Sequence, residues 1–393
     1  MPRLLAAIFL VLIATPAATQ TSPPFIVQSD NGDNRLQLGA LVQADARFAI
    51  DDPQNHVIDT FMLRRLRAQA QGRVARYFDF YVNLDFAGGI VNVRDAYFET
   101  RFSPAFRVRF GKGKAPFSYD RLILAANTLF GERGLTTTVA PDRDIGVQLS
   151  GDLAGARVSY AIALTNGVID GGSSDVDSND AKEVTGRIVA RPWSRAEHHP
   201  LRGLGLAVAG NSGTHAALPS FFTASRQIFF AYADAADNGR RVRWSPQAFY
   251  YHGPFGGYAE YVRSSGTIAK GGVSSGIDHD AWQVTGSWVL TGEAASDRRV
   301  DPRVNFDPAS GHMGAFQVVA RVEHLAVSRD AIGLGLAAPG ASRTADVWTT
   351  GLNWFFNPFI KWYVGFSRTV FDGDSHGPRH PENLISGRAQ LAF

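Results

Sequence analysis

The stretch that decides the fold is residues 344–371, TADVWTTGLNWFFNPFIKWYVGFSRTVF. On both sides of Asn357-Pro358, apolar side chains such as Trp362 alternate with polar or small ones such as Lys361. A period of two is the period of a β-strand. Proline cannot donate to a strand ladder and asparagine tolerates tight turns, so the two halves form a β-hairpin. The aromatic residues crowd beside the turn, which is typical of the aromatic girdle of a membrane barrel.

The same alternation recurs along the chain. In residues 77–86, for example, Phe78 and Phe80 fall on one face and Asp79 and Tyr81 on the other. The pattern predicts strands at 35–50, 58–74, 77–86, 91–102, 105–113, 145–151, 156–166, 182–193, 203–213, 241–251, 256–267, 281–290, 314–328 and 384–393, in addition to the two strands of the hairpin. Residues 221–233 could add one more, but bacterial single-chain barrels have even strand numbers, so we assign this segment to a loop. The sequence therefore predicts an all-β protein, a transmembrane antiparallel β-barrel of about sixteen strands.

Composition excludes several other classes of protein. After the N-terminus no apolar run approaches the roughly 20 residues of a transmembrane helix. The formal net charge of +3 is too small to indicate a nucleic-acid partner. The chain has no cysteine, which excludes disulfides, a thiol nucleophile and a cysteine metal site.

The first twenty residues have the pattern of a signal peptide. Arg3 is followed by an apolar stretch at 4–14 and by small residues up to Gln20. A buried first strand or a membrane anchor is the alternative, but the apolar stretch is too short to span a bilayer. We therefore expect a signal peptide at 1–20, a polar lead-in at 21–34 and an outer-membrane barrel at 35–393.

Short and long connections mostly alternate, as periplasmic turns and extracellular loops do in such barrels. Residues 114–144 form a long irregular connection with arginines among acids, and a loop of this length is usually functional. Further loops are expected at 167–181, 215–240 and 274–279. Residues 292–312 form a long connection where the alternation predicts a short turn.

Several segments, in this order, resemble the phosphate-selective porin O/P family. They are FMLRRLRAQAQGRV (61–74), YFDFYVNLDFAGG (77–89), VRDAYFETRFSPAFRVRFGKGKAPF (93–117), APDRDIGVQLSGDL (140–153), VSYAIALTNG (158–167), PQAFYYHGPFGGYAEYV (246–262), TTGLNWFFNP (349–358) and SGRAQLAF (386–393). The resemblance implies a sixteen-stranded trimeric porin in the outer membrane of a Gram-negative bacterium. It also implies that a third loop folds into the bore and that basic side chains draw in anions. Residues 114–144 match that loop in position.

Basic side chains on the predicted inward face and in the third loop are the candidate anion-binding, pore-lining residues. They are Arg65, Arg67, Arg107, Arg109, Arg121, Arg133, Arg187, Arg241, Arg243, Arg321, Lys361 and Arg388. A cationic, water-filled lumen concentrates anions, and an arginine offers a forked donor to phosphate or carboxylate. We expect Arg107, Arg109, Arg121 and Arg133 to lie nearest the constriction. Alternatively, many of these arginines pair with inward acids and serve only the barrel wall.

No catalytic residue, metal ligand or cofactor is predicted. Most histidines have no ligand spacing, and His376 and His380, although four residues apart, lie in a Gly/Pro-rich loop and not on a helix. No serine lies in a nucleophile elbow. The predicted function is passive diffusion of small hydrophilic solutes, with a preference for anions such as phosphate. The expected partners are small anions, outer-membrane lipid and further copies of the chain in a homotrimer. The alternative function is a plugged structural or adhesive surface barrel without transport.

Overall fold

The computed structural model describes residues 25–52, 57–177, 179–215, 217–237, 239–372 and 379–393. Among these residues, sixteen strands form the barrel: β2 (Arg35–Ile50), β3 (Thr60–Val74), β4 (Phe78–Asp85), β5 (Asn92–Ser103), β6 (Phe106–Lys114), β7 (Arg143–Leu153), β8 (Val158–Thr165), β9 (Glu183–Ala190), β10 (Leu204–Thr214), β14 (Arg240–His252), β15 (Phe255–Lys270), β16 (Val273–Val289), β17 (Ala315–Val327), β18 (Thr344–Phe355), β19 (Ile360–Phe371) and β20 (Glu382–Ala392). The other elements are short: β1 (Ile26–Gln28), α1 (Tyr119–Leu122), η1 (Ala125–Asn127), α2 (Thr136–Val139), η2 (Pro200–Gly203), β11 (Ser220–Phe222), β12 (Ile228–Ala231), β13 (Ala236–Asp237), η3 (Pro308–Ser310) and α3 (Asp330–Gly333). In the described part of the chain, no helix has the length and apolar character needed to cross a membrane.

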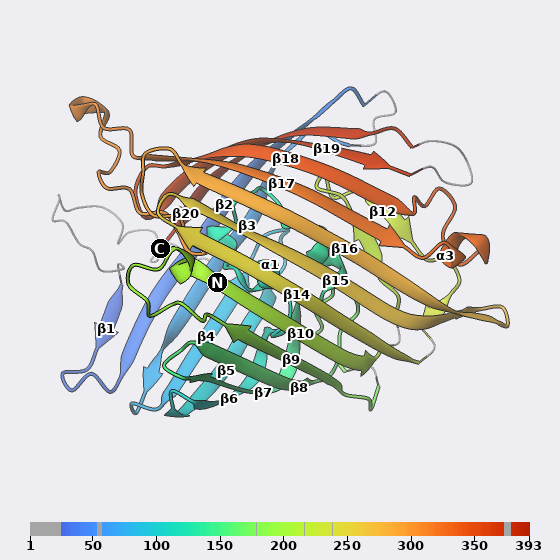
Figure 1. The fold of residues 1–393 in the computed structure, drawn as a ribbon, viewed down its shortest axis with the longest axis horizontal. Coiled ribbons are helices and arrows are strands. Elements are labelled where there is room, and N and C mark those ends of the chain that lie inside the picture. The colour runs from blue at the N-terminus through green and yellow to red at the C-terminus, as the bar shows by residue number, and fades with distance from the viewer. Residues whose placement is uncertain (1–24, 53–56, 178, 216, 238, 373–378) are drawn as a thin grey trace, which may run out of the picture.

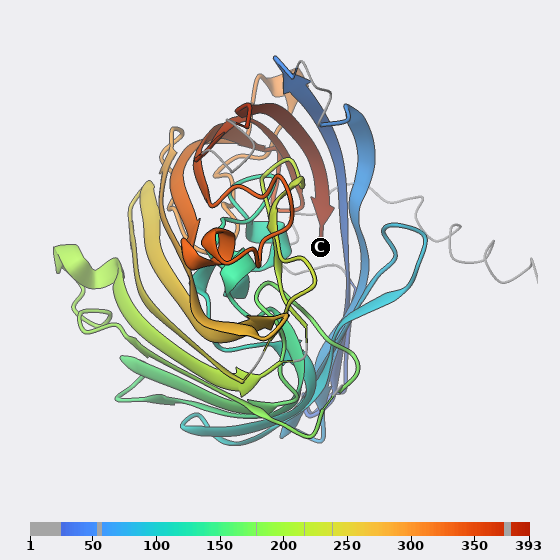
Figure 2. The same cartoon turned by 90° about the vertical axis from the view of Figure 1, so that its right-hand side faces the viewer.

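Each barrel strand pairs antiparallel with the next, and β20 pairs with β2, so that the sheet closes on itself (Figures 1 and 2). Asp45 of β2 stands opposite Arg388 of β20 at this closing seam, and the two side chains form a bidentate ion pair at 2.6 and 2.8 Å. The predicted sixteen-stranded antiparallel barrel is confirmed.

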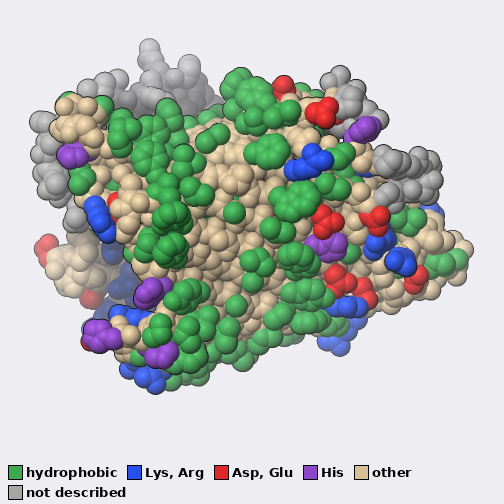
Figure 3. Space-filling model, turned by 45° about the horizontal axis from the view of Figure 1, so that its top comes forward, with side chains coloured by type: hydrophobic (Ala, Val, Ile, Leu, Met, Phe, Trp, Pro, Cys, Tyr) green, Lys and Arg blue, Asp and Glu red, His purple; other side chains and the backbone are tan. Residues whose placement is uncertain are grey.

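Exposure along β19 follows the alternation that the sequence predicted. Trp362 and Val364 are 51% and 53% exposed, whereas Tyr363 between them is 5% exposed. The same division on the other strands gives the barrel an apolar outer surface with charged side chains gathered toward its two ends (Figure 3). The outer surface is therefore apolar where a soluble protein would be polar.

The hairpin of β18 and β19 has its aromatic residues at the turn end. The ring centroid of Phe356 lies 4.2 Å from that of Trp354 and 5.1 Å from that of Trp362. Asn357 closes the turn, because its side-chain oxygen accepts hydrogen bonds from the backbone N–H groups of Phe359 and Ile360. The predicted turn chemistry therefore holds in the structure.

Two connections differ from the sequence-based expectation, and a third is the long connection that the sequence showed in place of a short turn. Residues 274–279 were expected to be a loop, but they belong to β16, whose hairpin with β15 continues to a tight turn at Gly271 and Gly272. Residues 221–233 lie outside the barrel sheet, yet they contain β12 and part of β11, which pair with each other. The long segment between β16 and β17 folds back, and its Ala295 and Val300 pack against the inner side of Phe355.

The connection between β6 and β7, residues 115–142, folds into the bore and is called the third loop below. It carries α1, η1 and α2, which lie inside the barrel when the molecule is viewed along its bore (Figure 2). Phe117, Leu135 and Val139 pack in a buried cluster with Phe221 of β11 and with the inner faces of β15 and β16. The interior is thus partly filled by the third loop and the β11–β12 hairpin.

At the N-terminus, the predicted signal peptide lies outside the described residues. The described part of the lead-in includes β1, which pairs antiparallel with the start of β2.

Candidate functional site

Polar side chains of the barrel wall hold the third loop across the bore. Lys361 Nζ donates to the carbonyl of Thr128 at 2.9 Å, and Asn353 Nδ2 donates to the carbonyl of Leu129 at 2.9 Å. Gln390 Nε2 likewise donates to the carbonyl oxygen of Ala126. Side chains of the wall therefore supply the hydrogen-bond donors that these loop carbonyls would otherwise receive from a helix or a strand.

Two buried carboxylates on strands β15 and β17 hold the helical parts of the loop. Glu260 accepts from the backbone N–H of Tyr119 at 2.8 Å, and Glu323 accepts from the backbone N–H of Leu135 at 2.6 Å. Charged acceptors strengthen such hydrogen bonds. The third loop is thus fixed to the part of the wall that β15 to β20 form.

Two large cavities lie between the third loop and the barrel wall, and each of the strands β3 to β7 contributes to one or both of them. The turn-side cavity, of about 470 Å³, reaches Pro358 and the 290–314 segment at the end of the short turns. The loop-side cavity, of about 580 Å³, reaches Ser173 and the β11–β12 hairpin at the end of the long loops. Among the described residues, only Arg67, Ala125 and Arg143 line both cavities, so they mark the constriction between them.

Basic side chains dominate the loop-side cavity. Among the described residues, nine arginines and five carboxylates line it: Arg64, Arg65, Arg67, Arg94, Arg121, Arg133, Arg143, Arg226 and Arg321 with Asp85, Glu132, Asp142, Asp170 and Glu323. In the described part of the chain, Arg65 has no carboxylate partner and instead donates to Gln43 Oε1 at 2.5 Å. Glu132 of the third loop accepts from Arg64 at 2.6 and 3.0 Å and from Arg47 at 2.5 Å. Burial alone would raise the pKa of Glu132, but the Arg64 guanidinium holds it well below its usual range, so this carboxylate stays ionised.

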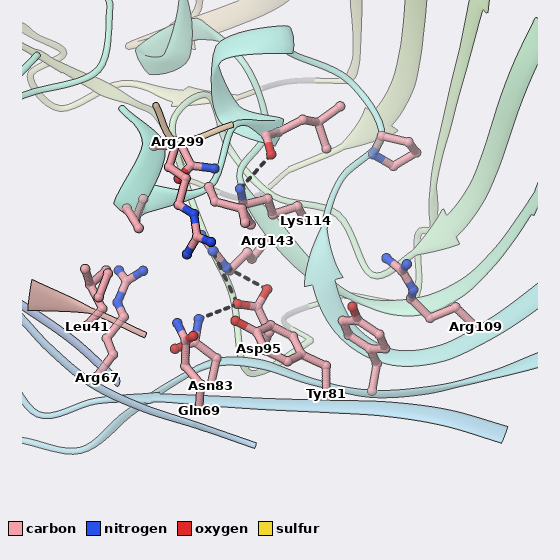
Figure 4. A pocket seen from close by; sticks show the side chains of 18 of the residues that line it. Leu41, Arg67, Gln69, Tyr81, Asn83, Asp95, Arg109, Lys114, Arg143 and Arg299 are labelled. Carbon is pink, nitrogen blue, oxygen red and sulfur yellow. Dashed lines mark hydrogen bonds and ion pairs between the residues drawn. The ribbon is translucent and has the colours of Figure 1, made fainter. Parts of the chain in front are cut away.

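The turn-side cavity has a larger excess of positive charge. Among the described residues its basic side chains are Arg67, Arg109, Lys114, Arg143, Arg187 and Arg299, and its one acidic side chain is Asp95 (Figure 4). Asp95 is engaged by Arg143 at 3.0 Å and by the Asn83 amide at 2.8 Å. Lys114 Nζ donates to the carbonyls of Leu122 and Ile123, and Arg187 donates to Gln247 Oε1. Neither side chain is paired with an acidic side chain in the described part of the chain.

The candidate residues from the sequence separate into two groups. Seven line a cavity: Arg65, Arg67, Arg121, Arg133 and Arg321 line the loop-side cavity, and Arg67, Arg109 and Arg187 line the turn-side cavity. Five line neither cavity: Arg107, Arg241, Arg243, Lys361 and Arg388. Whether the first group binds anions stays a prediction.

The placements of three arginines correct the expectation from sequence. Arg107, expected near the constriction, lies beside the short turn between β5 and β6 and pairs with Asp152 at 2.6 Å. Arg243 is fully buried because Asp170 of the 166–182 loop folds over it and accepts its Nε–H at 2.6 Å. Arg241 lies 3.7 Å from the same Asp170 and also pairs with Asp237 at 3.2 Å. These two arginines therefore anchor loops rather than face the bore.

Alternation alone missed two arginines of the loop-side cavity, Arg64 and Arg94. Strict alternation places both on the apolar face, but each is the extra residue of a β-bulge, and the bulge turns its side chain inward. Their inward side chains pair with Glu132 and Asp142 of the third loop. An arginine at an apolar-face position was the available signal, because an unpaired charge facing lipid is costly.

No group of three or more histidine or acidic side chains among the described residues could hold a metal ion. The arrangement instead places two cavities with basic linings on either side of Arg67, Ala125 and Arg143.

Comparison with known families agrees with this geometry. The family model described as phosphate-selective porin O and P matches residues 36–393, nearly the whole chain. The chain belongs to this family. It is an outer-membrane porin of a Gram-negative bacterium, a channel and not an enzyme.

Solved structures show the same fold at low sequence identity. OmpT of Vibrio cholerae, expressed in the outer membrane, is 13% identical, with a TM-score of 0.59 over 94% of this porin and 100% of that chain. An anion-selective porin from Comamonas acidovorans is 10% identical, with a TM-score of 0.59 over 92% of this porin and 100% of that chain. In-vitro folded OmpT of Vibrio cholerae in its trimer form is 11% identical, with a TM-score of 0.55 over 92% of this porin and 99% of that chain. No curated protein sequence matches the porin at a significant level.

Proposed function

We propose that this porin passes small hydrophilic solutes by diffusion and prefers anions, phosphate among them. The observation that carries the proposal is the basic lining of both cavities, which meet at Arg67 and Arg143. Solutes on this path pass two guanidinium groups at the narrowest region.

The electrostatics of a confined bore favour this function. Low-dielectric walls focus the field of the lining charges and raise the local concentration of oppositely charged ions. Ion pairs with Asp85 and Asp95 hold Arg67 and Arg143 in place. Arg65 and Arg187, which have no acidic partner among the described residues, then leave a net positive potential on both sides of the constriction.

Phosphate is included because arginine presents parallel N–H donors that match its oxygens. The loop-side cavity would meet an incoming phosphate first, and it contains the larger number of guanidinium groups. The paired acids of that cavity limit how tightly any anion is held, which suits passage rather than capture.

The proposal also covers assembly, partners and maturation. The apolar outer surface would contact outer-membrane lipid, and three copies would associate, as in the trimer form of the structural neighbour. Residues 1–20 would direct export and be removed as a signal peptide.

Zero-current potentials in planar bilayers test the anion preference. Under a tenfold KCl gradient, the sign of the potential tells whether chloride or potassium carries more current. We expect the zero-current potential to have the sign that indicates a larger chloride current. The opposite sign, which indicates a larger potassium current, would refute the electrostatic argument. A barrel that conducts no current would favour the plugged alternative instead.

A further inference from the structure

The third loop presents apolar side chains to the turn-side cavity. Leu124 is 59% exposed although it lies inside the barrel, and Leu122 and Pro116 line the same cavity. Single exposed leucines are common on protein surfaces, so Leu124 by itself means little. Its position beside Ala125, at the constriction, places an apolar side chain on the path of every solute.

Aromatic rings line the same cavity from the barrel wall. Tyr81 of β4 and Tyr97 of β5 stand opposite each other in the sheet, with ring centroids 5.7 Å apart. The Arg109 guanidinium lies over the Tyr97 ring, 4.1 Å from its centroid. Neither tyrosine hydroxyl has a hydrogen-bond partner among the described residues, although both side chains line the cavity. These rings offer faces and edges to a flat apolar group.

A site for an anionic head group adjoins this apolar region. Arg67 uses Nε to donate to Asp85 at 2.8 Å, and its two terminal nitrogens have no partner among the described residues. Figure 4 shows the Arg67 guanidinium directed into the cavity, on the same side as Asn83 and Asp95. Two parallel N–H donors of one guanidinium fit the two oxygens of a carboxylate.

We propose that the turn-side cavity is a binding site for carboxylates that carry an apolar ring. The carboxylate pairs with the terminal nitrogens of Arg67, and the ring lies between Leu124 and the Tyr81–Tyr97 pair. This inference rests on the proposed anion preference and narrows it to a class of organic anions. Inorganic phosphate uses the same guanidinium but gains nothing from the apolar side chains.

Competition between benzoate and acetate tests the inference. Each is added to a porin in a planar bilayer that carries chloride current, and the concentration that halves the current is measured. Both anions have one carboxylate, so a difference between their half-blocking concentrations measures the contribution of the ring. We expect benzoate to act at about fivefold lower concentration than acetate, since an aromatic contact contributes about 1 kcal/mol.

Variants connect this difference to the cavity. Leu124→Asn and Tyr81→Ser should each bring the benzoate value to within about twofold of the acetate value. Leu334→Asn makes the same change as the first variant at a leucine that is 45% exposed in the loop beside α3 and lines neither cavity. It should keep the full difference.

The outcomes separate the two proposals. If the KCl gradient gives the chloride sign but benzoate and acetate act equally in the wild type, the ring site is refuted and the anion preference stands. If benzoate is preferred but both cavity variants keep the difference, the site lies elsewhere and the inference is also refuted. If the gradient gives the potassium sign, the anion preference itself is wrong.

Discussion

Replacing Arg67 with glutamine should reduce the preference for chloride over potassium in a salt-dependent way. Arg67 lines both cavities, so each ion passes close to its guanidinium. Two unit charges about 4 Å apart in water interact by about 1 kcal/mol. The variant removes this attraction for chloride and this repulsion for potassium, so the permeability ratio changes by at most about 2 kcal/mol, or about 30-fold.

Salt screening sets the measured size of the effect. The Debye length is about 10 Å at 0.1 M and about 3 Å at 1 M. We therefore expect the chloride-to-potassium permeability ratio of Arg67→Gln to fall about tenfold in dilute KCl and by less than about threefold near 1 M. The assay is the zero-current potential of single porins in planar bilayers, measured with tenfold KCl gradients at both concentration ranges.

Arg107→Gln is the matched control. Arg107 is also an inward arginine paired with one aspartate, but it lines neither cavity. Its variant should leave the permeability ratio within about twofold of wild type. Equal effects of the two variants, or an Arg67 effect that does not change with salt, would refute the reasoning.

Three further predictions concern the loop anchor, the buried histidine and the outer surface. Lys361→Met removes the buried amine that donates to the carbonyl of Thr128, a hydrogen bond of about 1 kcal/mol, so single-channel recordings should show larger current fluctuations from the third loop, whereas Lys361→Arg should stay close to wild type. Burial, with Arg243 nearby, lowers the pKa of His215 to about 4, so the unfolded state binds more protons than the folded state between pH 6.5 and 4. The free energy of unfolding that neutral His215 contributes is therefore lost as pH falls through that window, by up to about 3 kcal/mol. Between pH 7 and 4 the Tm of His215→Gln should fall less than that of wild type, and an equal fall would contradict the lowered pKa of His215. Val364 is 53% exposed on the outer surface, so Val364→Arg should destabilise folding into lipid vesicles by about 2–4 kcal/mol in urea titrations, and Val364→Leu should not.

The strand pattern could be predicted from the sequence because alternation has a direct physical cause. In β19, Trp362 and Val364 face outward while Lys361 and Tyr363 face inward, as their chemistry requires when one side is apolar and the other polar. Long irregular connections interrupt the same pattern, so the third loop was also visible in the sequence.

The interior of the bore could not be predicted in the same way, because tertiary contacts decide it. The alternation along its strand places Arg243 on the inward face, but Asp170, far away in sequence, covers it. The alternation places Arg64 on the outward face, but a β-bulge turns its side chain inward toward Glu132 of the third loop. Alternation assigns a side chain to a face; it cannot say which loop lies against that face.

Chemical modification of Ala125→Cys tests most directly the claim that solutes cross a basic constriction between the two cavities. The natural chain has no cysteine, so this thiol would be the only one, and Ala125 lines both cavities. In planar bilayers, an anionic methanethiosulfonate reagent should reduce the current from either side of the membrane, and should react faster than a cationic reagent of similar size. A current that neither reagent changes, or faster reaction of the cationic reagent, would contradict the account.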